Sequence, residues 1–201
     1  MDRLKQHDEG YTLIELLIYV GLFLLVAFIV GSILLNSLRI SATVTNSTST
    51  VQGGQLIARS VDAGIRNATS LNVASVPGRP NDQLLRARSS IVKLTGSVKT
   101  TTWRCLAWYY DSVNQKVYTK SNSSAAVPVP AISDLTGHGW TLLSAGVTSS
   151  TTPFVNSTDS NGPKLTTNYN VRAGDVAGAT YQTIIITLQQ PDTTTGPTTC
   201  F

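Results

Sequence analysis

The stretch that decides the fold is Gly10-Tyr11-Thr12-Leu13-Ile14-Glu15, which leads into an apolar run from Leu16 to Leu35. The run has twenty residues and no charged side chain. In a helix, at about 1.5 Å per residue, it would span the hydrocarbon core of a bilayer, which is roughly 30 Å thick. The sequence therefore predicts a membrane-spanning helix over residues 11–35, preceded by a polar leader over residues 1–10.

Glu15 stands at the entrance of this apolar run, where burying an ionised carboxylate without a partner costs on the order of a few kcal/mol. Cutting the bond between Gly10 and Tyr11 would supply a partner, because the new ammonium group of Tyr11 lies four residues from Glu15. The alternative makes Glu15 an interfacial residue at the end of an ordinary anchor. A secretory signal peptide is a further alternative, but its apolar region would be shorter and an A-x-A-like cleavage site would follow it.

Gly10, the segment Tyr11–Glu15 and the apolar helix together resemble the class III signal of type IV prepilins and pseudopilins. The resemblance covers the first 35 residues. It implies that a membrane aspartyl protease, prepilin peptidase, cuts after Gly10 and methylates the new N-terminus at Tyr11. It also implies that Glu15 is used in filament assembly.

Two features of this sequence depart from the pattern of the family. Tyr11 stands where the family most often has phenylalanine, which is a mild change between aromatic rings. The apolar helix also lacks the proline that many major pilins carry about twenty residues into the mature chain. The missing proline favours a minor subunit over a major, mass-assembled one.

The rest of the chain has the composition of one globular domain. Hydrophobic residues make up 41% of the 201 residues and the net charge is only +4, which argues against disorder of the whole chain. Arg3 and Lys5 precede the apolar run, so the positive-inside rule places the leader in the cytoplasm and the head outside it. We expect the helix to continue over residues 36–68, with a kink or break at Gly53-Gly54, and a β-rich head over residues 69–201.

Beyond Ala68 the apolar residues recur with a period of two, which predicts an antiparallel sheet. The expected strands are Leu165–Arg172, Tyr181–Gln189, Val98–Tyr110 and Gln115–Lys120 as a hairpin, Ile91–Thr95 and Gly139–Ser144. The expected loops, rich in Gly, Pro, Asn and Ser, are Pro77–Gln83, Ser121–Pro130, Thr148–Pro163 and the tail from Pro191. The expected fold class is α+β and pilin-like: a long N-terminal α-helix, partly transmembrane, packed on a C-terminal antiparallel β-sheet domain. Within the helix, Leu56, Val61 and Ile65 are expected to face the core.

Cys105 and Cys200 are the only cysteines. A head outside the membrane would face an oxidising compartment, so we expect them to form a disulfide that closes most of the head. Such a bond would be worth roughly 4 to 5 kcal/mol in the chain-entropy model. Two reduced, unrelated thiols are the alternative.

The sequence has no signature of catalysis or of a metal centre. It contains no GxSxG elbow, no P-loop and no zinc-ligand spacing, and its two histidines are His7 in the leader and His138 in Gly137-His138-Gly139-Trp140. We expect His138 to lie in a turn. The expectation is therefore a protein that is not an enzyme and uses no cofactor and no metal.

Basic residues gather between Arg79 and Lys120, with tryptophan and tyrosine among them. This combination can hold the backbone and bases of a nucleic acid. The candidate contacts are Arg86, Arg88, Lys93, Lys99 and Arg104. In the competing interpretation, alternate strand positions present Lys and Arg to water while the tryptophans fill the core.

The resemblance implies a minor pilin of a type IV pilus, a structural subunit that primes or decorates the filament and serves adhesion or DNA uptake. The alternatives are a pseudopilin of a type II secretion system and a membrane-anchored extracellular binding domain. The expected partners are prepilin peptidase, other pilins or pseudopilins, the membrane and, through the basic stretch, DNA. The expected location is the inner (cytoplasmic) membrane as a single-pass protein, and after assembly an extracellular pilus or a periplasmic pseudopilus, with the head outside the cytoplasm.

Overall fold

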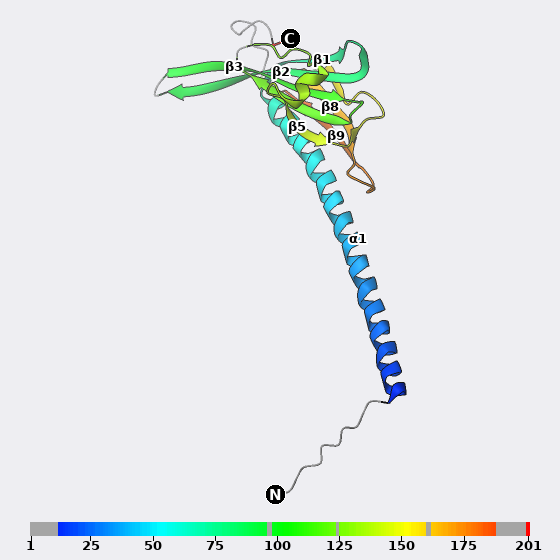
Figure 1. The fold of residues 1–201 in the computed structure, drawn as a ribbon. Helices are drawn as coiled ribbons and strands as arrows, with labels where there is room; N and C mark the ends of the chain where they lie inside the picture. Colours follow the sequence, from blue (N-terminus) through cyan, green and yellow to red (C-terminus); the bar gives the residue numbers. More distant parts are fainter. Residues whose placement is uncertain (1–11, 96–97, 124, 160–161, 188–199) are drawn as a thin grey trace. The chain divides into compact units, whose positions relative to one another are not determined.

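The computed structural model describes residues 12–95, 98–123, 125–159, 162–187 and 200–201 (Figure 1). The chain divides into two compact units, residues 1–45 and residues 46–201. One helix, α1 (Leu13–Arg66), begins in the first unit and ends in the second. The second unit also contains every strand of the described residues, so the α+β class expected from the sequence is confirmed.

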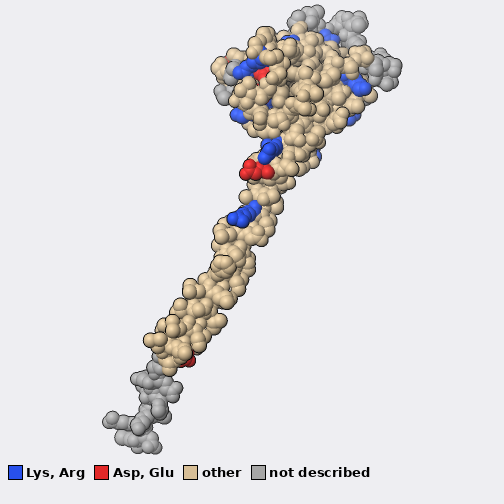
Figure 2. All heavy atoms as spheres, turned by 90° about the vertical axis from the view of Figure 1, so that its right-hand side faces the viewer, with Lys and Arg blue, Asp and Glu red and all other residues tan. Residues whose placement is uncertain are grey.

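The described part of the first unit belongs to α1, and its residues 16–35 form the apolar part of that helix. Large apolar side chains lie exposed on all sides of it, and Phe23 and Phe28 are 70% and 79% exposed. The surface of this part of the helix is almost entirely uncharged in Figure 2. A helix that is apolar all round belongs inside a membrane or a larger apolar assembly, and this helix is long and apolar enough to cross a bilayer.

In the second unit, α1 becomes amphipathic. Its buried apolar side chains are Ile57, Val61 and Ile65, which follow one another at intervals of four residues and therefore share one face. The expectation that Leu56 faces the core is wrong, since that side chain is 49% exposed and its neighbour Ile57 is buried instead. The helix ends at Arg66, two residues before the expected boundary.

The expected break at Gly53-Gly54 is also wrong, because α1 runs through both glycines. These glycines instead admit close neighbours: a Cβ on Gly54 would overlap the ring of Tyr181. Tyr181 Oη donates to the carbonyl of Val51 and Tyr169 Oη donates to that of Gly54, each at 3.1 Å. The two tyrosine rings stack with centroids 5.6 Å apart, so the missing side chain lets a pair of aromatic rings fix the helix to the sheet.

Five antiparallel strands in the order β1-β2-β3-β4-β5 form the larger sheet. They are β1 (Ala68–Val76), β2 (Arg79–Thr95), β3 (Val98–Asp111), β4 (Lys116–Asn122) and β5 (Thr141–Ala145). The β3–β4 hairpin agrees with the expectation to within two residues at each end. The loop expected over Pro77–Gln83 is wrong beyond its first two residues, because β2 already begins at Arg79.

A second antiparallel sheet places β8 between β9 on one side and β6 and β7 on the other. Its strands are β6 (Val147–Thr148), β7 (Phe154–Asp159), β8 (Gly162–Val171) and β9 (Ala179–Ile186). The loop expected over Thr148–Pro163 is interrupted by β7, so that expectation is wrong there. Between β5 and β6 lies Gly146, whose φ of 70° and close contact with the backbone of Arg172 leave no room for a side chain.

The core of the head lies on both faces of the larger sheet. On one face, Leu85, Ala87 and Trp108 pack with α1 and with the inner side of β8. On the other face, Leu84, Tyr109 and Tyr118 form a second cluster with the following buried residues: Val76, Cys105, Ala107, Val127, Leu135, Trp140 and Cys200. The short 3₁₀ helix η1 (Ile132–Thr136) supplies Leu135 to this second cluster.

Replacing Gly54 with alanine tests the contact between α1 and the tyrosine pair. We expect Gly54→Ala to destabilise the head by about 1 to 3 kcal/mol, because the new methyl group has to displace the Tyr181 ring. Tryptophan fluorescence during denaturant unfolding of the full chain in neutral detergent would measure this. Gly21→Ala is the control, since a Cβ there meets nothing within 4 Å; an equal effect of both changes would contradict the proposed contact.

Candidate functional site

The N-terminal end of α1 is the first candidate site. Gly10 and Tyr11, the residues of the expected cleavage and methylation, lie outside the described part of the chain. Glu15 is described, and it lies exposed in the first turn of the helix. Its backbone N–H lies 3.0 Å from the carbonyl oxygen of Thr12 and 3.4 Å from the hydroxyl Oγ1 of the same residue.

These contacts reveal a local role for Glu15 that the sequence reasoning missed. Thr12 precedes the helix and Glu15 follows it by three positions, which is the spacing of a capping box. A carboxylate in the first turn also interacts favourably with the helix dipole. The signal was present in the sequence as Thr-x-x-Glu, and any test of Glu15 in assembly has to separate its charge from helix capping.

The apolar surface behind Glu15 is the second part of this site. From Leu16 to Leu35 every residue except Gly31 lies exposed, and no described residue from outside the helix covers this surface. Contiguous apolar surface of this extent marks contact with a membrane or with another protein. The site therefore consists of the Glu15 carboxylate in the first turn of α1 and the exposed apolar helix surface that follows it.

The basic stretch is divided between the two faces of the larger sheet. Arg86 and Arg88 alternate with the buried residue Ala87 on β2, so they lie on the face opposite to α1. Arg104 is paired with Ser89 and lies exposed on the other face. Lys93 and Lys99 belong to the described backbone of β2 and β3, but their side chains lie outside the described ones.

Arg86 is held by its surroundings on the sheet. Its Nη2 donates to Asn72 Oδ1 at 2.9 Å, and its guanidinium lies 5.8 Å from the centroid of the Phe201 ring. Burial lowers the pKa of Arg86, and its buried Nε–H has no hydrogen-bond partner among the described residues. Arg86 is thus a partly desolvated cation that packs against an aromatic ring.

Arg88 has a similar environment. Its Nε donates to Thr69 Oγ1 at 3.1 Å, and its guanidinium lies 4.8 Å from the centroid of the Trp103 ring. A guanidinium over an aromatic face is stabilised by cation–π attraction. Of the tryptophans, Trp108 and Trp140 are buried, as the competing interpretation expects, and Trp103 is partly exposed.

Cys105 and Cys200 are joined in the structure, with Cα atoms 5.4 Å apart. The bond ties the end of the chain to β3, and both cysteines are buried in the cluster on the outer face of the larger sheet. It also places Phe201 beside Arg86. The two cysteines are 95 positions apart in the sequence, so the disulfide restricts most of the head in the unfolded chain.

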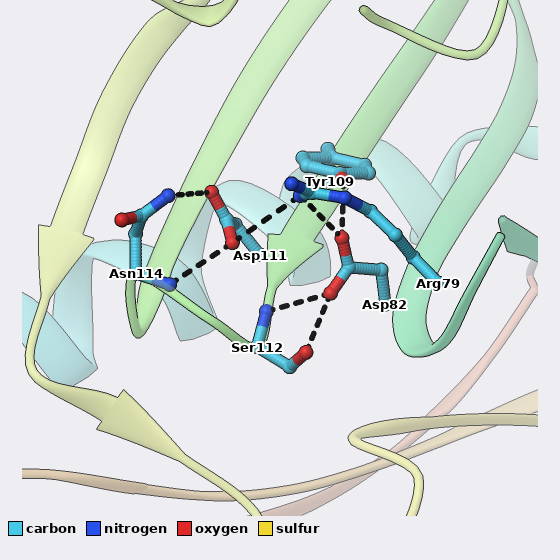
Figure 3. A network of polar contacts seen from close by, with 6 residues as sticks. All are labelled: Arg79, Asp82, Tyr109, Asp111, Ser112 and Asn114. Atoms are coloured by element: carbon cyan, nitrogen blue, oxygen red, sulfur yellow. Dashed lines mark hydrogen bonds and ion pairs between the residues drawn. The ribbon is translucent and has the colours of Figure 1, made fainter. Parts of the chain in front are cut away.

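A buried polar network lies at the end of β2 and β3, where the sequence led us to expect a loop (Figure 3). Asp82 and Asp111 are both fully buried. Asp82 accepts hydrogen bonds from Tyr109 Oη, from the backbone N–H and hydroxyl of Ser112, and from Arg79 Nη1 at 3.0 Å. Asp111 accepts from the backbone and side chain of Asn114 and lies 3.7 Å from Arg79.

The hydrogen bonds of this network decide the charge of Asp82. Burial alone would raise the pKa of Asp82, but the bonds from Ser112, Tyr109 and Arg79 outweigh it and lower that pKa. Burial, together with the bond to Asp82, raises the pKa of Tyr109. Because each carboxylate is occupied by donors from its own hairpin, the network joins the ends of β2 and β3 and leaves neither Asp82 nor Asp111 placed as an acid or base for a ligand.

A polar cleft of about 540 Å³ lies beside this network. It is lined by Pro80, Asn81, Tyr110, Ser112 and residues 148–152, which carry hydroxyl and amide groups but no charged side chain. His138 lies elsewhere, in the turn expected from the sequence: its φ is 53°, and its Nδ1 is 3.5 Å from Asp134 Oδ1. Within the described residues, no group of three or more His, Cys, Asp or Glu side chains is placed to hold a metal ion.

Replacing Asp82 with asparagine tests the network. At pH 7 we expect Asp82→Asn to destabilise the head by about 3 kcal/mol, because it removes the charge around which four donors are arranged. A carboxyl whose pKa is lowered by folding contributes stability above its unfolded pKa of about 3.9 and loses it as the pH falls through the folded pKa. The difference between wild type and variant should therefore shrink below about pH 4.

Urea unfolding of the full chain in neutral detergent at several pH values would measure this difference. The exposed residue Asp175 provides the control, since Asp175→Asn removes the same charge without touching the network. A pH-independent cost of Asp82→Asn, or an equal cost of Asp175→Asn, would contradict the account of the buried carboxylate.

No family model, no curated protein and no solved structure matches the chain.

Proposed function

We propose that this protein is a minor subunit of a type IV pilus, held in the membrane by the apolar half of α1 before it enters the filament. The single observation that carries the proposal is the bare apolar helix with Glu15 in its first turn, directly after the Gly10-Tyr11 pair. The length of α1 supports it, because one continuous helix contains both the apolar segment and a part of the core of the head.

Two kinds of surroundings can cover the apolar part of α1: the lipid of a membrane, or other apolar helices in a filament. Every backbone hydrogen bond of a helix is made within the helix, so it is stable both in lipid and among other apolar helices. Moving from one apolar environment to the other changes little apolar area in contact with water and has a small net cost. The transfer therefore needs a specific interaction to give it direction and register.

Glu15 is the group that could supply this interaction. Cutting after Gly10 would create an ammonium group at Tyr11, and the Glu15 carboxylate of one subunit could pair with the ammonium group of its neighbour. Opposite charges attract far more strongly in an apolar medium than in water, and an unpaired one is costly there. The pair would thus select one axial position of each subunit.

A pseudopilin of a type II secretion system would use the same helix and the same pair. The two proposals differ in the filament that the subunit joins. Recovery of the protein with pili sheared from the cell surface would favour the pilus. Retention in the periplasm together with loss of protein secretion on deletion would favour the pseudopilus.

Substitutions at Glu15 test the role of its charge. Glu15→Ala and Glu15→Gln should both leave leader cleavage intact and reduce incorporation into sheared filaments by about tenfold or more, since each loses an ion pair worth over about 1.4 kcal/mol in apolar surroundings. Quantitative immunoblotting of the sheared fraction against the membrane fraction would measure this.

Glutamine is the informative replacement, because it fits a capping box as well as glutamate does but carries no charge. Thr12→Ala is the matched control: it removes the hydroxyl that faces the Glu15 N–H and leaves the carboxylate in place. Normal incorporation of Glu15→Gln together with poor incorporation of Thr12→Ala would reduce Glu15 to a helix-capping residue and refute its part in assembly.

A further inference from the structure

We propose that the outer half of the β2–β3 hairpin is a DNA-binding arm that lies in the major groove of double-stranded DNA. The basic arm consists of residues 90–95 of β2 and residues 98–103 of β3. The inference does not depend on the proposed function, because it concerns the head alone and is tested on the purified chain.

The pairing register shows that the basic arm extends past the rest of the sheet. β1 pairs with β2 no further than Ser89, and β4 pairs with β3 no further than Cys105. Beyond these positions β2 and β3 pair with each other over six residue pairs, from Ser90↔Trp103 to Thr95↔Val98. Figure 1 shows this two-stranded ribbon projecting from the sheet.

All the charged residues of the β2–β3 hairpin between Gln83 and Tyr110 are basic. Between Gln83 and Tyr110 the sequence has five basic residues and no Asp or Glu, and the carboxylates just outside, Asp82 and Asp111, are buried in their own network. Of the five, Arg86 and Arg88 lie on the sheet beside aromatic rings. The other three belong to the basic arm and its base.

Register places these three cations along the ribbon. Lys93 pairs with Thr100 and Leu94 pairs with Lys99, so the two lysines occupy neighbouring residue pairs of the basic arm. Arg104, which is exposed, follows at its base, one residue beyond Trp103. Successive residue pairs lie on opposite faces of the ribbon, so Lys93 shares a face with Arg104 and Lys99 lies on the other face. Cations on both faces can approach the phosphates on the two sides of a DNA groove.

The dimensions of the basic arm suit the major groove of B-form DNA. At about 3.4 Å per residue, six residue pairs extend for about 20 Å. The major groove is about 12 Å wide and admits a two-stranded β-ribbon. Besides the lysines, the arm carries three consecutive threonines, Thr100–Thr102, and hydroxyl groups of this kind commonly bind phosphate oxygens.

The composition of the arm favours DNA over an anionic membrane. Surfaces that insert into a bilayer interface use tryptophan, tyrosine or phenylalanine. The basic arm has one such residue, Trp103, which lies at its base with the Arg88 guanidinium 4.8 Å from the centroid of its ring. The mixture of lysine with threonine instead resembles surfaces that contact a phosphodiester backbone.

Fluorescence anisotropy of the full chain in neutral detergent, with a fluorescein-labelled duplex of about 30 base pairs as probe, tests this inference at several salt concentrations. We expect Lys93→Gln, Lys99→Gln and Arg104→Gln, combined in one variant, to weaken binding at least about tenfold. The slope of log K against log salt concentration should flatten by about 2.7, or 0.9 for each lost phosphate contact.

A charge-matched variant provides the control. Arg39→Gln, Arg59→Gln and Lys164→Gln remove the same three charges outside the hairpin and should leave the affinity and the slope within about a factor of two of wild type. Because the basic arm lies outside both core clusters, we expect both variants to keep the tryptophan fluorescence of the folded head.

Three results would overturn the inference. The first is no salt-dependent binding of the wild-type chain to the duplex near 50 mM salt, where phosphate contacts of about three cations should be detectable. The second is an equal loss in the arm variant and in the control. The third concerns binding of the full chain to vesicles that contain phosphatidylserine. If the arm variant binds these vesicles more weakly than wild type but binds DNA equally well, the partner is an anionic membrane.

Discussion

Helix α1 combines two kinds of surface in one unbroken helix: an apolar surface along its first part and an amphipathic surface along its second part. Along residues 16–35 its side chains are apolar in nearly every direction and lie exposed, so an apolar environment outside the chain has to cover them. Along residues 46–66 only the face with Ile57, Val61 and Ile65 is apolar, and the head covers that face. The packing of the head, the proposed membrane anchoring and the proposed entry into a filament all depend on this division of one helix.

The head attaches to α1 through close contacts that only glycine permits. Gly54 meets the ring of Tyr181 from the smaller sheet, and Gly64 meets the ring of Trp108 from the larger one. Trp108 Nε1 also donates to Ser60 Oγ at 2.9 Å, and Tyr169 and Tyr181 donate to carbonyls of the helix. Since each sheet contributes an aromatic ring and a hydrogen bond, the second half of α1 serves as part of the core of the head.

Simple periodicity predicts much of this fold, and its failures have physical causes. Alternation correctly predicts β3, β4 and β8, whose inner faces are buried. It misses β1, whose middle residues are all partly buried and show no alternation. It also misses the start of β2, because Pro77–Gln83 has the composition of a loop while the buried carboxylate of Asp82 stabilises that strand end with side-chain hydrogen bonds. At the candidate sites, the N-terminal motif is local and can be read directly. The faces of Arg86 and Arg104 depend on sheet register, which composition does not contain.

The proposed role as a pilus subunit depends most on whether the chain is processed as one. Intact mass and N-terminal sequencing of the protein, expressed with and without prepilin peptidase, would test this directly. We predict that the peptidase removes residues 1–10 and leaves an N-methylated Tyr11 next to the helix that carries Glu15. An uncut chain in the presence of active peptidase would contradict the account and would leave an anchored extracellular binding domain in its place.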